Sequence, residues 1–91
     1  MEEQILTQAV DRIREMEVIF DALLAAADRV PPAVPEDRLA VLLEYYEGGQ
    51  WLRDYELDEA GLLPVDLKRG VLSEDGVYNL LARIRDTILH S

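Results

Sequence analysis

The stretch that decides the fold is residues 45–78, YYEGGQWLRDYELDEAGLLPVDLKRGVLSEDGVY. It holds all four tyrosines of the chain, its one tryptophan, all five glycines and its one lysine. Glycine readily adopts the left-handed geometry that ends a helix, and proline cannot continue one. Gly48, Gly49, Gly61 and Pro64 therefore predict short helices separated by sharp breaks. So many special residue types in one stretch also suggest a surface used for recognition.

Before this stretch the sequence predicts two amphipathic helices. Between about Glu2 and Asp28, apolar residues recur at spacings of three and four, which is typical of a helix with a wide apolar stripe. The prolines of residues 30–35 end this helix, and Pro35 is suited to the first position of the next. The first helix is long for a chain of 91 residues. We therefore expect it to pack against more than one later helix or against a second copy.

The remaining segments complete an all-α prediction of four helices in a single domain over residues 1–91. A third helix is expected at about residues 50–60, an irregular connector at 62–72, and a last helix with Ser73 as its N-cap and with Glu74 and Asp75 near its start. The last helix should pack antiparallel to the first, and the middle segment should cap one end. The shared core is predicted to contain Ile13, Met16, Phe20, Leu80, Leu81 and Ile84.

Composition and charge narrow the classes of function. The chain has no cysteine, which excludes disulfides and thiolate metal sites, and its start, MEEQILTQ, has no apolar core of a secretory leader. No apolar run approaches the length that spans a bilayer, so a cytoplasmic location is expected. The net charge is −10, and the one adjacent basic pair is Lys68–Arg69. Direct binding to nucleic acid or to an anionic membrane is therefore disfavoured.

The acidic run in the centre invites a metal-binding interpretation. Asp54, Glu56 and Asp58 imitate the start of a calcium loop, with Asp66 as a further weak candidate ligand. The imitation fails at the sixth loop position, which is Glu59 instead of glycine, and at the twelfth, which lacks the required glutamate. We expect a solvated or ion-paired face, and keep a carboxylate-based metal-binding enzyme as the alternative.

No set of residues predicts catalysis or a bound cofactor. The one histidine, His90, stands near the end of the sequence, and Ser73 has no base beside it in the sequence. The glycines match no phosphate-binding loop. We therefore predict no catalytic residue and no cofactor.

The basic pair and the aromatic residues have two interpretations each. Lys68 or Arg69 is expected to fold back onto the acids at 54, 56 or 58; the alternative is an exposed basic contact for a partner. Tyr46, Trp51 and Tyr55 are expected to form a core cluster at the helix junction. Adjacent residues on a helix cannot face the same way, so Tyr45 is expected to be exposed or in an interface.

Residues 45–81, YYEGGQWLRDYELDEAGLLPVDLKRGVLSEDGVYNLL, resemble a family of small bacterial proteins known as a domain of unknown function. The matching positions are Tyr45–Tyr46, Trp51, Asp54–Glu56, Gly61, Leu63–Pro64, Asp66–Asp75, Tyr78 and Leu80–Leu81. The resemblance implies a small helical bacterial protein of the cytoplasm. It implies no activity, no cofactor and no catalytic residue.

These observations together favour a non-catalytic protein–protein interaction module or regulator. Its partner is unknown, and a homodimer through the long first helix is one expectation. A second alternative is an acidic mimic of nucleic acid that binds a basic protein. The candidate partner-binding residues are Tyr45, Trp51, Arg53, Asp54, Lys68, Arg69 and Asp75.

Overall fold

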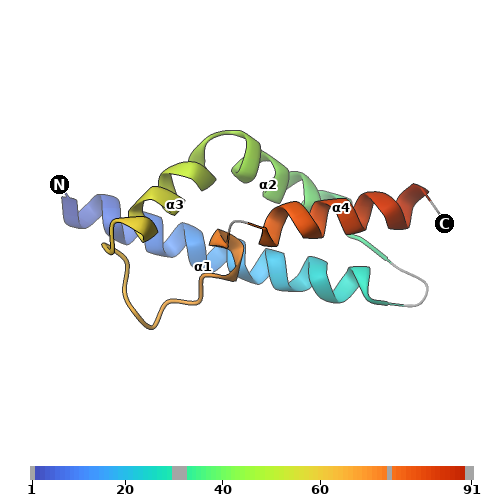
Figure 1. Ribbon diagram of the computed structural model, residues 1–91, viewed down its shortest axis with the longest axis horizontal. Coiled ribbons are helices and arrows are strands. Elements are labelled where there is room, and N and C mark those ends of the chain that lie inside the picture. Colours follow the sequence, from blue (N-terminus) through green and yellow to red (C-terminus); the bar gives the residue numbers. More distant parts are fainter. Residues whose placement is uncertain (1, 30–32, 74, 90–91) are drawn as a thin grey trace.

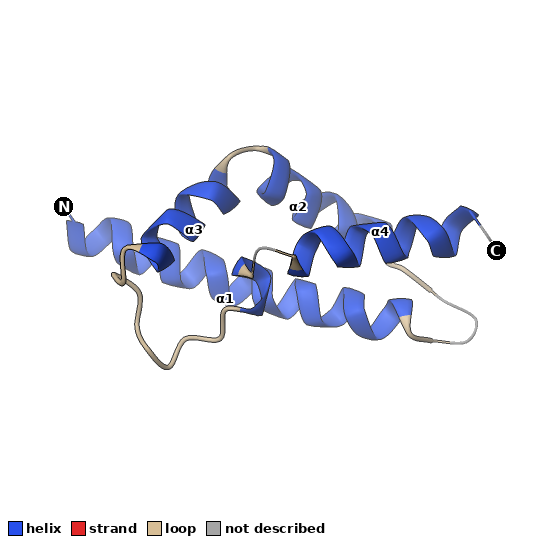
Figure 2. Cartoon of the chain, viewed as in Figure 1, coloured by secondary structure: helices blue, strands red, loops and turns tan. Residues whose placement is uncertain are grey.

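The residues that the structure describes form an all-α fold with four α-helices, as predicted. The computed structural model describes residues 2–29, 33–73 and 75–89. Its elements are α1 (Glu2–Ala27), α2 (Glu36–Glu47), α3 (Gln50–Glu59), a single 3₁₀ turn η1 (Gly70–Leu72) and α4 (Gly76–Leu89) (Figures 1 and 2). The described ranges contain no strand. Pro31, Pro32, Glu74 and His90 lie outside them, so the roles predicted for these residues stay predictions.

The predicted breaks around α3 are confirmed. Gly49 has a φ of 97° and Gly61 a φ of 72°, both in the left-handed region that side chains disfavour. Gly49 turns the chain between α2 and α3, and Gly61 is the second residue of the connector formed by residues 60–69. The irregular connector expected at residues 62–72 is confirmed as far as residue 69, because residues 70–72 form η1, and it buries Leu63 and Leu67.

The prediction that α1 and α4 are antiparallel is wrong. Contacts between them advance together along both helices: Gly76 lies near Phe20, and Arg83 pairs with Asp28. The two helices therefore run in the same direction (Figure 1). The connector is the physical reason: α2 and α3 travel back along α1, and the connector then returns the chain to the middle of α1 before α4 begins.

The segment 45–78 lies along α1, so the prediction that it caps one end is also wrong. Asp54 bonds to Arg12, Val71 bonds to Glu17, and Lys68 bonds to Asp21. The three partners on α1 occupy the central part of that helix. This arrangement gives the long helix its packing partners within one chain.

One core joins all the elements. Its buried members are Ile13, Met16, Phe20, Leu23, Ala27, Leu42, Tyr45, Leu63, Leu67, Val71, Leu72, Val77, Leu80 and Ile84, with Leu81 packed against them. The core predicted for α1 and α4 is thereby confirmed. The opposite side of α1 carries a row of exposed polar residues at helical spacing, Gln4, Gln8, Asp11 and Glu15, continued by the exposed Val18. The main apolar stripe of α1 is thus covered by the rest of the chain.

The two adjacent tyrosines have exchanged their expected places. Tyr45 is 2% exposed, because it follows Leu42 by three positions and shares its core-facing side of α2. Tyr46 is half-buried and packs edge-on against Trp51, with ring centroids 5.2 Å apart. Trp51 in turn stacks on Tyr55 at 5.1 Å. The three rings form a cluster as predicted, but they are half-buried and not part of the buried core, and the exposure predicted for Tyr45 is wrong.

The start of α4 also differs from the prediction. Ser73 is not its N-cap: the helix begins at Gly76, and the Ser73 hydroxyl donates to the Gly70 carbonyl at 2.9 Å. The backbone N–H of Ser73 bonds to the same carbonyl at 3.2 Å. Ser73 therefore closes η1, and the turn that it forms displaces the helix start.

This turn makes Gly76 sterically restricted. A Cβ atom at Gly76 would lie 2.8 Å from the Gly70 carbonyl oxygen, close to the Ser73 hydroxyl and 3.4 Å from the Phe20 ring. Alanine normally stabilises a helix relative to glycine by up to about 1 kcal/mol. Here we expect Gly76→Ala to lower the free energy of unfolding by about 1–3 kcal/mol, because backbone must move to admit the methyl group.

Urea unfolding followed by circular dichroism measures this effect. The double variant Ser73→Ala/Gly76→Ala is the control: it removes the hydroxyl contact but keeps the Gly70 carbonyl contact, so it should remain destabilised relative to Ser73→Ala. A Gly76→Ala protein as stable as the wild type would show that the turn is not packed this closely.

Candidate functional site

An ionic cluster around a buried carboxylate, which we call the Asp54 cluster, consists of the half-buried Arg12 with Tyr45 and Asp54. Asp54 is 0% exposed. Arg12 donates to both of its carboxylate oxygens, from Nε at 2.9 Å and from Nη2 at 2.5 Å, and the Tyr45 hydroxyl donates at 2.7 Å. A buried carboxylate is tolerated only when such partners replace its hydration. The cluster joins α1, α2 and α3 at one point.

The electrostatic environment of the cluster favours the charged form of Arg12 and the protonated form of Tyr45. Burial raises the pKa of Tyr45, and the hydrogen bond to Asp54 and its negative charge raise it further. The hydrogen bond to Asp54 raises the pKa of Arg12, and burial opposes this shift. The Tyr45 proton and the Arg12 charge are thus held against Asp54. The three side chains therefore form a structural junction between α1, α2 and α3.

The second polar junction is built around the backbone of Val71. The buried Glu17 carboxylate accepts the Val71 N–H at 2.8 Å, and the Trp51 indole N–H donates to the Val71 carbonyl at 2.8 Å. Both polar groups of one buried peptide residue are therefore bonded to side chains, from α1 on one side and α3 on the other. This junction holds η1 against the helices.

The basic pair behaves in part as predicted. Arg69 pairs with Asp58 and also donates to the carbonyls of Pro64 and Leu67, which confirms that it folds back onto the acidic run. Lys68 pairs with a different acid: its Nζ lies 3.1 Å from Asp21 on α1. The two neighbouring cations thus fix the connector to two different helices.

The candidate partner-binding residues do not gather on one surface. Tyr45 and Asp54 are buried and bonded to each other, so the exposure predicted for Tyr45 is wrong. Trp51 is half-buried, and Arg53 is exposed beside the α2–α3 turn, in a hollow that Met16 and Tyr45 also line. Asp75 is exposed just before α4, and Lys68 and Arg69 lie on the connector.

The weak metal candidates are likewise separated. Asp54 is occupied by Arg12 and Tyr45, Asp58 by Arg69, while Glu56 and Asp66 are exposed. Within the ranges that the structure describes, no group of three or more carboxylate or histidine side chains is placed to hold a metal ion. The acidic run therefore does not converge as a calcium loop would.

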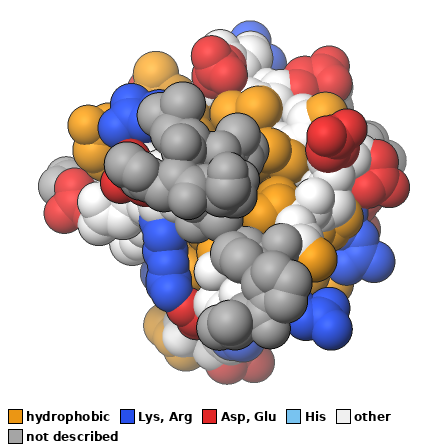
Figure 3. All heavy atoms as spheres, turned by 90° about the vertical axis from the view of Figure 1, so that its right-hand side faces the viewer, with side chains coloured by type: hydrophobic (Ala, Val, Ile, Leu, Met, Phe, Trp, Pro, Cys, Tyr) orange, Lys and Arg blue, Asp and Glu red, His pale blue; other side chains and the backbone are white. Residues whose placement is uncertain are grey.

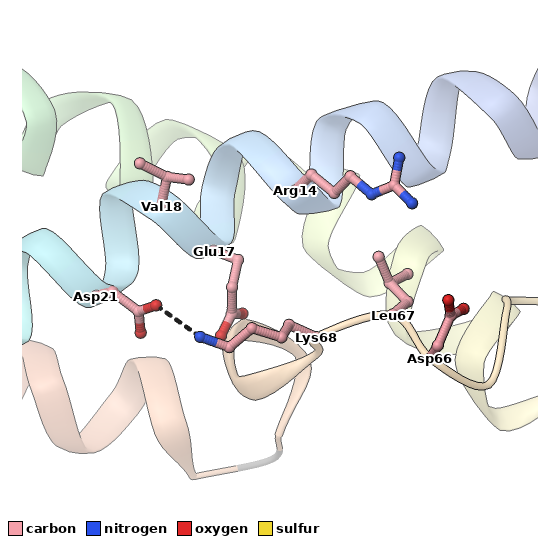
Figure 4. A pocket seen from close by; sticks show the side chains of 7 residues that line it. All are labelled: Arg14, Glu17, Val18, Asp21, Asp66, Leu67 and Lys68. Carbon is pink, nitrogen blue, oxygen red and sulfur yellow. Dashed lines mark hydrogen bonds and ion pairs between the residues drawn. The ribbon is translucent and has the colours of Figure 1, made fainter.

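A surface that the sequence did not reveal lies between α1 and the connector, and we call it the seam. One hollow of about 310 Å³ is lined by Arg14, Glu17, Val18, Asp21, Asp66, Leu67 and Lys68 (Figure 4). A second, of about 560 Å³, is lined by Glu3, Leu6, Thr7, Val10, Asp11, Arg14, Leu62, Leu63 and Pro64. Arg14 lines both, so the hollows adjoin along α1.

The exposed side chains of the seam combine apolar and acidic character. Leu62, which lines the seam, is 55% exposed, and Val65, in the same connector but outside the lining, is 98% exposed. Figure 4 shows the Arg14 guanidinium and the Asp66 carboxylate at one end of the first hollow and the Lys68–Asp21 pair at the other. Neither Arg14 nor Asp66 forms an ion pair within the described residues. The end of the molecule that faces the viewer in Figure 3 shows hydrophobic, basic and acidic side chains together.

Some of these features left a signal in the sequence. Arg12 stands seven positions from Ile5 and from Ile19, and residues seven apart share a helix face, so its place beside the apolar stripe was readable. Glu17 directly follows the core residue Met16 and was similarly close to the buried side. Leu62 and Val65 gave no signal, because only the path of the connector decides which of its aliphatic residues face solvent.

The Asp54 cluster leads to a test of stability. Asp54→Asn leaves the Arg12 guanidinium without its counter-charge, and we expect it to lower the free energy of unfolding by about 3–5 kcal/mol. Asp58→Asn is the matched control, because it breaks the more exposed pair with Arg69 and should cost about 1 kcal/mol or less. Urea unfolding of both variants measures the difference.

A triple variant completes this test. Arg12→Met/Tyr45→Phe/Asp54→Leu replaces all three polar groups with apolar ones of similar size and should recover most of the lost stability. Equal costs for Asp54→Asn and Asp58→Asn would contradict the burial of the cluster.

Tyr45 predicts a loss of stability at high pH. Its raised pKa keeps it protonated in the folded protein, whereas the unfolded phenol ionises near its ordinary pKa of 10.0. Below that pH the contribution of Tyr45 to stability is complete. Above it, ionisation of the unfolded phenol should lower the free energy of unfolding by about 1.4 kcal/mol per pH unit. Tyr45→Phe should lack this part of the loss in urea unfolding at a series of pH values. Parallel losses in both proteins would show that Tyr45 is not buried in this way.

Comparison with known proteins gives a family. No helix in the described ranges has the length and apolar character needed to cross a membrane. No curated protein and no solved structure matches the chain. A family model described as a domain of unknown function (DUF4298) matches residues 2–90, which is nearly the whole sequence. The chain therefore belongs to this family.

Proposed function

We propose that the protein is a non-catalytic interaction module that binds a partner protein through the seam, in the cytoplasm of a bacterium. The observation that carries this proposal is the open apolar lining of the seam, where Leu62 remains 55% exposed beside Leu6 and Val10. A small domain needs most of its large aliphatic residues for its core, and exposed groups of such residues are typical of binding surfaces.

The use of the polar residues supports the same proposal. The buried carboxylates Asp54 and Glu17 accept internal hydrogen bonds, and in the described residues no buried side-chain nitrogen or oxygen is left without a partner. Such groups hold the scaffold together. The metal-binding alternative has no comparable support, because its four candidate acids lie apart.

A second copy is a weaker candidate for the partner than a different protein. Most of the long stripe of α1 that suggested a homodimer is covered by the rest of the chain, with Leu6 and Val10 left at the seam, and the opposite side of α1 is polar. Each copy also carries a net charge of −10, which opposes self-association. A different protein therefore suits the seam better.

Site-specific photo-crosslinking tests the proposal. A benzophenone amino acid at Leu62, in the seam, should give a covalent adduct with one discrete protein in the native cells. The same replacement at Leu52, which is 53% exposed on α3 and outside the seam, is the matched control and should give none. Circular dichroism verifies that both variants remain helical.

Mass spectrometry of the adduct separates the outcomes. A different protein captured from Leu62 alone supports the proposal. Equal adducts from both positions, or none from Leu62, would overturn it. An adduct with a second copy of this chain would replace the separate partner by a homodimer.

A further inference from the structure

The shape of the seam restricts the kind of segment that fits it. Its residues on α1 run from Glu3 to Asp21, which corresponds to about 27 Å of straight helix. An added strand needs an exposed sheet edge, and the described residues form no sheet. A polyproline segment needs an aromatic-lined groove, and no aromatic residue lines either hollow. Of these three modes, a helix laid along α1 is the one that the seam can accept.

The lining supplies an apolar floor for such a helix. Leu6 and Val10 stand four apart on α1, and Leu62 and Pro64 face the same hollow from the connector. Helices bind grooves of this kind through apolar residues at spacings of three and four. Val18 and Leu67 extend the apolar character into the first hollow.

The charges around the apolar floor determine which sign of charge the partner helix should carry. Glu3, Asp11 and Asp66 line the seam and form no ion pair within the described part of the chain, whereas Lys68 is already neutralised by Asp21. Of the two cations that line the seam, Arg14 and Lys68, Arg14 is the one that forms no ion pair with a described residue. The unpaired charge is therefore mainly acidic, and the net charge of −10 attracts cationic partners from a distance.

We infer that the seam binds a basic amphipathic helix of the partner protein, with aliphatic residues on one face and lysine or arginine along its edges. This inference rests on the proposed function and adds the chemistry of the partner. Arg14, between the two hollows, further specifies one acidic residue near the middle of that helix. The aliphatic face provides affinity, and the charges fix direction and register.

A model peptide tests the inference directly. The probe is an 18-residue helix of leucine and lysine with leucines at helical spacing and one central glutamate, a length that covers about 27 Å. The control peptide has the same composition in an order without helical period. In a titration of ¹⁵N-labelled protein, we expect the first peptide to shift amide signals of residues that line the seam, and the second to shift none.

Variants with reversed charges then test whether peptide binding depends on the acids of the seam or on the net negative charge of the whole protein. Glu3→Lys/Asp11→Lys should weaken binding of the helical peptide about tenfold, because two attractive contacts become repulsive. Glu44→Lys/Glu56→Lys gives the same net charge at exposed positions outside the seam and should change the affinity by less than about twofold.

Each outcome decides the inference. Equal weakening by the two double variants, equal binding of the two peptides, or shifts outside the seam would overturn it and favour a diffuse acidic surface, as in a mimic of nucleic acid. If Leu62 captures a partner while the helical peptide does not bind, the interaction module stands and the basic helix falls. If neither binds, both proposals fall.

Discussion

The bidentate ion pair between Arg12 and Asp54 is the contact on which the rest of the arrangement depends. A carboxylate with no solvent exposure is stable only when donors surround it, and the donors here come from two other helices. The pairing therefore fixes α3 and α2 on α1 in one register, since a shift of either helix would leave a buried charge unpaired. A purely apolar junction would tolerate small shifts.

The seam exists because the connector is held in a specific path. Glu17 and Trp51 bond the two sides of the Val71 peptide, and Arg69 and Lys68 tie the preceding residues to α3 and α1. The connector consequently returns along α1 without covering it fully. The same path makes α4 run parallel to α1, so the direction of the last helix and the open hollows have one cause.

Local chemistry allowed much of this fold to be predicted. Glycine and proline positions give the helix breaks, and the spacing of apolar residues gives α1 and its core face. What local chemistry could not give is the direction of α4, which depends on how far a non-helical connector travels. The exchange of Tyr45 and Tyr46 has a similar origin, because a buried hydroxyl is acceptable only where another residue, here Asp54 on the next helix, accepts its hydrogen bond.

The candidate site was harder to predict for the same reason. The acids at 54 and 58 look alike in the sequence, yet one lies in the core and the other pairs near the surface. Their difference is set by which cation meets each of them, Arg12 from the first helix or Arg69 from the connector. The seam itself is made by two segments about fifty residues apart, so no local pattern could announce it.

The lysine beside the seam has a practical consequence for chemistry on this protein. Lysine occurs once in the sequence, and the Lys68 side chain is 76% exposed where it meets Asp21. An amine-directed reagent, or an enzyme that acylates lysine, therefore finds one side chain to modify. Loss of its charge would free Asp21 and make the wall of the seam more acidic. One neutral acyl group would thus be enough to report on, or to alter, this surface.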